Sequence, residues 1–323
     1  VSVSDLSTSA LSRFRQLAER SGRRDAAALK EPDAALLDKL RLTEGDYLKR
    51  AAVLLFHPDP ERFVTGAFAK IGYFRTAADL VYHDEVNGDL FTQARQTLDL
   101  LLSKYLKAVV TYEDIVRVER FPVPREALRE AVLNALVHRD YMNSAPIQIR
   151  VYDDRLVMWN PAMLPEGWTQ QTLLEPHISQ PYNPDIANTF FRAGEIEAWG
   201  RGIERMFTAC RDAKTPEPQI RFEAGGIWTE FMFSAEYLAA ISGEPDRGDA
   251  GETPVKTPVK TPDRILGMLA SNPELTLAEV AGAIGKSQSA VERASAKLVK
   301  QGRLRFVGPR KGGHWEVLED DDE

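Results

Sequence analysis

The chain has 323 residues, 43% of them hydrophobic and 28% charged, with a formal net charge of −7 at pH 7. This composition is typical of a globular protein with two or three domains and excludes a disordered or fibrous chain. One cysteine and five scattered histidines exclude a disulfide framework and a zinc finger. Neither a long apolar window nor an apolar N-terminal leader is present, so we expect a cytoplasmic protein that does not insert into a membrane.

The spacing of apolar residues predicts a mixed α+β body. Helical spacing is found over residues 6–17, 34–40, 90–106, 124–138 and 195–210. Residues 68–73, 147–152 and 156–159 are typical of strands, and Asp153-Asp154 between the last two indicates a hairpin. The apolar run at the end of 47–56 fits either a buried strand or the end of a buried helix.

A linker and a basic segment follow this body. Residues 253–262 repeat the unit Thr-Pro-Val-Lys, and proline at every fourth position predicts an extended spacer. Residues 253–315 contain eleven Lys and Arg but only four Asp and Glu, and an acidic tail ends the chain. A basic module joined to an acidic body suggests an appendage that binds nucleic acid.

The basic module is predicted to fold as helix, helix, tight turn, helix and hairpin. Helices are predicted over 263–270 and 276–284, with Thr276 and Glu279 as a capping box. A third helix runs from Ser287 to the glycine after Gln301, and 303–307 pairs with 314–317 as a wing. This order resembles the winged helix-turn-helix of bacterial regulators, which inserts its third helix into the major groove of double-stranded DNA.

The resemblance assigns DNA contacts to the start of the third helix, its basic face and the wing. The predicted DNA-binding residues are Lys286, Ser287, Gln288, Ser289, Arg293, Lys297, Arg303, Arg305, Arg310 and Lys311. A winged helix that contacts protein instead remains open. The Gly-Lys-Ser at 285–287 is not a P-loop, because that motif needs four residues between its glycines and a preceding strand.

A carboxylate and an amide lie four residues apart on the helix predicted over 124–138. Glu130 and Asn134 therefore share one helix face, where they could hold Mg²⁺ and orient a water, with Glu130 as general base. The alternative is structural: Glu130 and Asn134 join the polar residues at 138–140, His138, Arg139 and Asp140, in a network that fixes the helix and its following turn.

The stretches REALREAVLNALVHRDY and SQPYNPDIANTFFRAGEIEAWGRGIERM, with the strands between them, closely resemble a family of bacterial transcriptional regulators often labelled RecG-related helicases. The resemblance implies a central GHKL-type ATPase domain, like that of histidine kinases and gyrase B. In this comparison Glu130 and Asn134 match the N-box, with Asn134 as the Mg²⁺ ligand. Gly200 and Gly202 match the second glycine box, whose amides approach phosphates. Asn160 takes the place of the adenine-reading Asp of DxGxG, and Ala162 and Met163 follow where glycines are usual.

The resemblance implies a domain order that starts with an AlbA-like domain, which is missing before residue 1. We expect an α/β N-terminal region over 1–112, a divergent GHKL-like domain over 113–240, a linker over 241–262, the winged helix over 263–318 and an acidic tail over 319–323. The predicted function is a homodimeric regulator that binds operator DNA through the winged helix and senses a ligand, ATP with Mg²⁺ among the candidates, or a partner. The alternatives are a weak Mg²⁺-dependent ATPase and a non-catalytic interaction scaffold.

Overall fold

The computed structural model describes two compact units, Val1–Arg247 and Gly248–Glu323. The described residues are 1–23, 26–113, 116–175, 178–197, 200–242, 265–266, 268–270, 272–273, 275–284, 288–308 and 314–318. The division falls in the predicted linker, most of which lies outside these residues, as does the acidic tail. Among the described helices, none is both long and apolar enough to cross a bilayer.

The first unit is built on a six-stranded sheet in the order β4-β3-β7-β8-β10-β9. Its strands are β3 (Ala69–Thr76), β4 (Asp79–Val86), β7 (Ile147–Val151), β8 (Arg155–Pro161), β9 (Gln219–Glu223) and β10 (Gly226–Met232). β3 and β7 pair in parallel, and the other neighbours are antiparallel. The mixed sheet confirms the predicted fold class. Two strands of this sheet, β3 and β4, come from the predicted N-terminal region 1–112. Strands from both sides of the predicted boundary at 112 therefore belong to one sheet.

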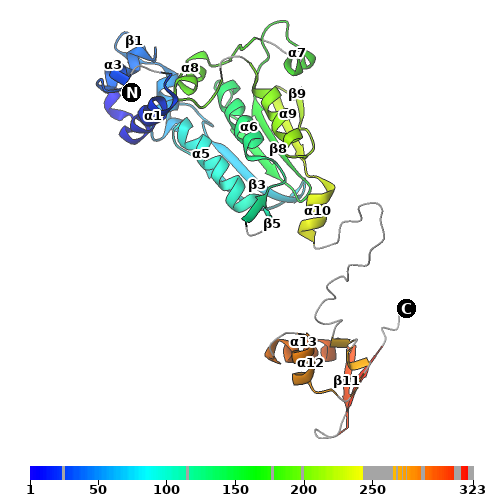
Figure 1. Ribbon diagram of the computed structural model, residues 1–323. Coiled ribbons are helices and arrows are strands. Elements are labelled where there is room, and N and C mark those ends of the chain that lie inside the picture. Colours follow the sequence, from blue (N-terminus) through cyan, green and yellow to red (C-terminus); the bar gives the residue numbers. More distant parts are fainter. Residues whose placement is uncertain are drawn as a thin grey trace. The chain divides into compact units, whose positions relative to one another are not determined.

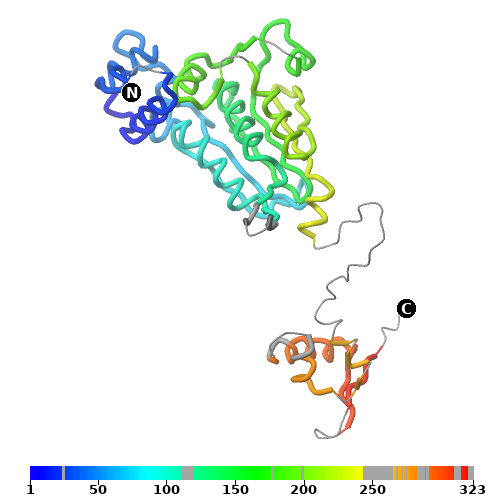
Figure 2. Tube along the Cα trace, in the orientation of Figure 1, coloured from blue at the N-terminus to red at the C-terminus, as the bar shows by residue number. Residues whose placement is uncertain are grey.

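Helices of the first unit cover one face of this sheet, and the chain can be followed in Figures 1 and 2. The helices are α1 (Thr8–Ser21), α2 (Ala26–Leu29), α3 (Asp33–Lys39), α4 (Arg50–Phe56), α5 (Leu90–Leu100), α6 (Arg125–His138), α7 (Gln170–Leu174), α8 (Pro184–Arg192), α9 (Gly202–Asp212) and α10 (Ala235–Ser242). α5, α6 and α9 lie across the sheet (Figure 1). Short turns of helix, η1 (Val3–Asp5), η2 (Pro60–Arg62) and η3 (Leu101–Tyr105), and two small hairpins, β1–β2 (Thr43–Glu44, Tyr47–Leu48) and β5–β6 (Val109–Glu113, Val116–Arg120), complete the unit.

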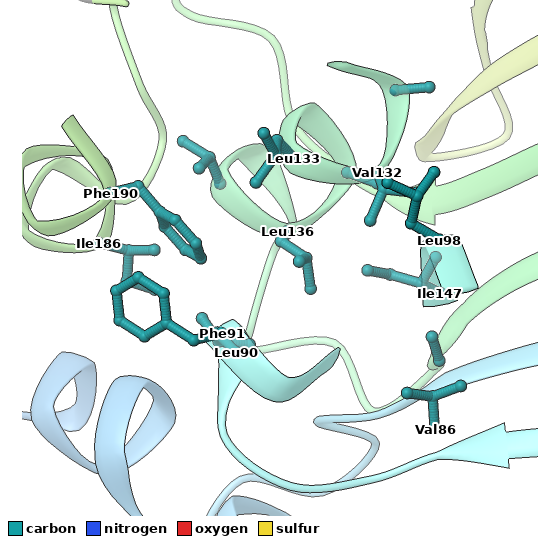
Figure 3. Close-up of a cluster of buried hydrophobic side chains, with 14 of the residues drawn as sticks. Val86, Leu90, Phe91, Leu98, Val132, Leu133, Leu136, Ile147, Ile186 and Phe190 are labelled. Carbon is teal, nitrogen blue, oxygen red and sulfur yellow. The ribbon is translucent and has the colours of Figure 1, made fainter. Parts of the chain in front are cut away.

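The core of the first unit lies between these helices and the sheet. β7 shows why: Ile147, Ile149 and Val151 are buried, whereas the residues between them are half-exposed, so one face of the strand packs inward. Figure 3 shows the centre of this core, where Leu133 and Leu136 of α6 lie near Phe190 of α8. Phe91 contacts the rings of Phe56, at 6.0 Å between centroids, and Phe190, at 4.7 Å. The aromatic contacts thus join α4, α5 and α8.

The predicted helix limits need three corrections. Residues 47–56 form β2 and α4, so the helix-end alternative is the one observed. The helix predicted to reach 106 changes to the wider π-helical turn η3 after Leu100. The helix predicted from 195 begins only at Gly202, because Gly194 and Gly200 both have the positive φ that ends or interrupts a helix.

The second unit has the predicted winged-helix elements. α12 (Leu277–Ile284) and α13 (Gln288–Lys300) precede the hairpin of β11 (Leu304–Val307) and β12 (His314–Val317). Thr276 and Glu279 form the expected capping box, since the Glu279 carboxylate accepts from the Thr276 amide at 2.8 Å and the Thr276 hydroxyl accepts from the Glu279 amide at 3.3 Å. A small separate core includes Ile265, Leu269, Val280, Val291 and Leu298.

Asp89 is the N-cap of α5, and replacing it tests how much the cap stabilises the first turn of this helix. The buried Asp89 carboxylate accepts hydrogen bonds from the Thr92 amide at 2.9 Å and the Thr92 hydroxyl at 2.7 Å. We expect Asp89→Ala to lower the free energy of unfolding by about 1–2 kcal/mol, since these two donors lose their acceptor. Urea unfolding measures it. Asp99→Ala, at the exposed end of the same helix, is the control and should change stability by less than about 0.5 kcal/mol; equal effects of the two changes would contradict the assignment.

Candidate ligand cavity and nucleic-acid interface

A cavity of about 410 Å³ lies in the first unit. Its walls come from α6, from the start of α9, from the helix-facing side of the sheet and from the segment 163–182. The lining includes four residues that the sequence assigned to nucleotide binding: Asn134, Asn160, Gly200 and Gly202. The first and last of them, Asn134 and Gly202, are 68 positions apart in the sequence. They come together because α9 packs beside α6.

The wall from α6 follows from helix geometry. Ala131, Asn134, Ala135 and His138 line the cavity, and their spacing of three and four residues places them on one face of the helix. The face of α6 that carries Leu133 and Leu136 is buried in the core. The amide of Asn183 donates to the carbonyls of Val137 at 2.8 Å and Arg139 at 2.7 Å, which satisfies acceptors at the end of the helix.

The first turn of α9 approaches α6 very closely. A Cβ built on Gly202 would lie 2.5 Å from Oε1 of Glu130, 3.0 Å from Nδ2 of Asn134 and 3.1 Å from its Oδ1. Any larger residue at 202 would therefore have to displace buried polar groups. Glycine is needed here because it allows the close approach of the two helices, and its backbone separates two hollows.

Glu130 and Asn134 both face Gly202 but line different hollows. Asn134 lines the cavity, whereas Glu130 lines a separate groove between α6 and α9 together with Arg129, Arg201 and Arg205. Glu130 is only 7% exposed. Burial raises the pKa of its carboxyl, and the positive charges of Arg205 and Arg129 act in the opposite direction. The structure thus brings the two residues together but does not bring Glu130 into the cavity.

Asn160 enters the cavity from the sheet. It lies on β8 and faces the helices, as Leu156 and Met158 of the same strand do. Its side chain is 4% exposed, and its one hydrogen bond in the described part of the chain is long, 3.4 Å from Nδ2 to the carbonyl of Pro161. The amide oxygen of Asn160 is therefore available to a ligand.

The alternative structural network is present in part. Arg139 is 1% exposed, donates to the carbonyls of Asn143 at 3.1 Å and Ala145 at 3.0 Å, and lies over the Tyr141 ring at 4.7 Å. Asp140 accepts from the Met142 amide at 2.9 Å. These contacts fix the connection between α6 and β7, which supports a structural role for Arg139 and Asp140.

The segment 163–182, including α7, is the part of the site that sequence reasoning missed. Met163, Trp168, Leu173 and Tyr182 line the cavity, and Met163 is 58% exposed and Tyr182 41% exposed. The segment lacks a strong periodic pattern and has no motif, so its sequence carries no clear signal that it lines a cavity.

In the winged helix, α13 presents exposed polar and basic residues. Gln288, Arg293 and Lys297 are exposed, and Gln288 donates to Glu292 at 2.9 Å. Arg305 is paired with Glu316 across the wing at 2.6 Å, whereas Arg303 is half-buried. Lys286, Ser287, Arg310 and Lys311 lie outside the described residues, as does the side chain of Ser289.

Comparison with known proteins assigns both units. Residues 144–231, which contain β7 to β10, match the family described as "Putative ATP-dependent DNA helicase recG C-terminal". Residues 263–305 match the family described as "Winged helix-turn-helix DNA-binding". The chain joins a RecG C-terminal-type, ATPase-like domain to a winged helix-turn-helix. The resemblance drawn from the motifs is confirmed for these two parts.

A solved structure shares this fold. The DIP2311 protein from Corynebacterium diphtheriae is 19% identical, with a TM-score of 0.59 over 98% of this chain and 62% of its own. The chain thus spans less than two thirds of that protein. Among curated proteins, none matches the sequence.

The close approach at Gly202 gives a direct test. We expect Gly202→Ala to lower the free energy of unfolding by about 1–2 kcal/mol, because the new methyl group collides with Glu130 and Asn134. In Glu130→Ala the collision with the carboxylate is relieved, so the double variant should be more stable than the sum of the single changes predicts, by about 1 kcal/mol. Denaturant unfolding of all four proteins measures this coupling; strict additivity would show that the two residues do not touch.

The buried Glu130 predicts a pH dependence of stability. Its pKa in the folded protein is raised above the ordinary 4.5, so the folded state holds the proton more tightly than the unfolded state does. Wild-type stability should therefore fall as the pH rises above 4.5, until the folded carboxyl has also ionised. Glu130→Gln does not titrate and should gain stability relative to wild type over the same range. Urea unfolding from pH 4 to 7 tests it, with exposed Glu126→Gln as control; parallel curves for wild type and Glu130→Gln would contradict it.

Proposed function

We propose that this chain is a transcriptional regulator. Its winged helix binds operator DNA, and its ATPase-like domain binds a small ligand in the cavity between α6, α9 and the sheet. The observation that carries the proposal is the combination, in one chain, of a DNA-binding module with an exposed basic helix and a separate unit with a formed cavity. Pockets of this size, lined by apolar groups and a few convergent polar ones, are typical of small-molecule sites.

The DNA-binding surface is centred on α13. Arg293 and Lys297 are four residues apart on one exposed helix face, so both can reach phosphates when the start of the helix enters the major groove. Gln288, at the N-terminus of the helix, is of a type that reads base edges. α13 therefore supplies two residues that can position the helix on the DNA backbone, Arg293 and Lys297. It also supplies one residue that can read bases, Gln288.

The residues of the first unit do not fit a Mg²⁺-dependent ATPase well. Asn134 is the one N-box group in the cavity lining, Glu130 lines the separate groove, and Ala162 follows Asn160 where the superfamily has glycine. Because Glu130 and Asn134 line different hollows, we favour ligand binding over hydrolysis.

Two further parts of the proposal follow from the organisation of such regulators. A homodimer would present two winged helices to neighbouring half-sites, so a footprint with dyad symmetry supports it. A scaffold whose winged helix contacts protein is the competing function, and the experiment on DNA separates the two.

Removal of the positive charges of Arg293 and Lys297 tests whether α13 binds DNA. We expect Arg293→Ala/Lys297→Ala to weaken binding to a mixed-sequence duplex and to make the plot of log affinity against log salt shallower by about 0.9 for each phosphate that is no longer neutralised. Fluorescence anisotropy between 50 and 200 mM NaCl measures both.

Two control variants frame that measurement. Lys214→Ala removes an exposed cation of the first unit and should leave the slope nearly unchanged, and Glu126→Gln, in the same unit, should do so too. A double variant with wild-type affinity and slope would leave the winged helix as a protein-binding module.

A further inference from the structure

The charge of the cavity lining limits the ligand. Among the described residues that line the cavity, none is Lys or Arg, and Glu166 is the acidic one. Arg201 and Arg205 do not line the cavity. They line the separate groove together with Glu130. A triphosphate would therefore bring several negative charges against walls whose described residues supply no side-chain cation, which is unfavourable. The residues outside the described ranges in the neighbouring stretches, Pro176, His177, Ala198 and Trp199, include neither Lys nor Arg.

Apart from Glu166 and His138, the polar side chains of the described lining are neutral and can both donate and accept. Asn134, Asn160 and Gln180 are amides, and Ser179 and Thr229 are hydroxyls. Asn160 is the most informative because only 4% of it is exposed, and its amide oxygen has no hydrogen bond in the described part of the chain. Because Asn160 lines the cavity, this oxygen offers an acceptor to a ligand there.

The chemistry of Asn160 differs from that of an aspartate. An ionised carboxylate only accepts hydrogen bonds, whereas an amide presents a donor beside an acceptor. That pair complements the edge of a nucleobase, where a donor lies next to an acceptor, and such paired contacts are how Asn reads adenine.

The remaining walls favour a flat, apolar body. Trp168 and Tyr182 are aromatic, and Ile203, Met206 and Ile227 are aliphatic or thioether groups around the same space. At about 410 Å³, the cavity lies in the lower part of the range for small-molecule pockets.

We propose that the cavity binds an uncharged aromatic heterocycle of nucleoside size, held by paired hydrogen bonds to Asn160, and that phosphate groups add nothing to its affinity. This inference rests on the proposed function and gives the class of its ligand. The cavity thus recognises the base and sugar part of a nucleotide and not the triphosphate.

Calorimetry with the full chain tests the proposal. The probes are the four ribonucleosides and the four matching ribonucleoside triphosphates, each triphosphate with and without Mg²⁺. We expect saturable binding of at least one nucleoside, an affinity at least equal to that of its triphosphate, no response to Mg²⁺ and little change between 50 and 300 mM NaCl, because an uncharged ligand releases no ions.

Variants locate the binding. Asn160→Leu keeps the approximate size but has neither donor nor acceptor, and we expect it to lower nucleoside affinity at least tenfold. Ile227→Trp fills the cavity from the sheet without removing a polar group and should abolish binding. Glu204→Gln, in the groove on the other side of α9, is the matched control and should bind as wild type does. Circular dichroism and the unfolding midpoint show whether each variant is folded, so the absence of binding in a folded Ile227→Trp keeps the test valid if Asn160→Leu is unstable.

Three results would overturn the proposal. They are a magnesium triphosphate that binds at least tenfold more tightly than its nucleoside, no binding of any nucleoside at millimolar concentration, and nucleoside binding that persists in folded Ile227→Trp. The first leaves the proposed function intact with a different ligand class. Failure of the function itself shows separately, as an absence of DNA binding by the wild-type protein or as no effect of the α13 double variant.

Discussion

The close contact between α6 and α9 at Gly202 is the constraint on which the site depends. With no side chain at 202, the start of α9 lies against Glu130 and Asn134, and the helix backbone then divides a cavity from a groove. Asn134 and Gly200 line the cavity, while Glu130, Arg201 and Arg205 line the groove. The packing of α9 against α6 therefore sets which charged side chains lie outside the cavity lining.

In the proposed function, a domain of the ATPase type binds a ligand without hydrolysing ATP. The sheet, α6 and α9 form the cavity for it. Asn160 contributes an uncharged amide, and bulky Met163 lies close behind it in the chain and lines the same cavity. Fold and function separate at such sites, because the scaffold fixes where a ligand binds and a few side chains fix which ligand it is.

Sequence patterns predicted those elements in which buried residues recur at one regular spacing. α6 and α5 carry strong apolar stripes, and the winged helix adds caps and a repeat-marked linker to its pattern. β4 was missed because most of its residues are exposed at the sheet edge, so no apolar alternation marks it. The site was predictable only where motifs name residues, as for Asn134, Asn160 and Gly202. That Glu130 lies outside the cavity depends on the helix contact, which no local pattern encodes, and the segment 163–182 has no clear period.

The two units have separate cores, and this limits how ligand binding can affect DNA binding. The core around α5, α6 and α8 shares no buried residue with the core of the winged helix in the described parts of the chain. One shared core therefore does not carry a ligand effect from the cavity to α13. Coupling requires that the ligand favour one of two states of the chain that differ in affinity for DNA. Because the proposed ligand site lies in the first unit, a ligand effect on DNA affinity should disappear when the winged helix is cut from the body.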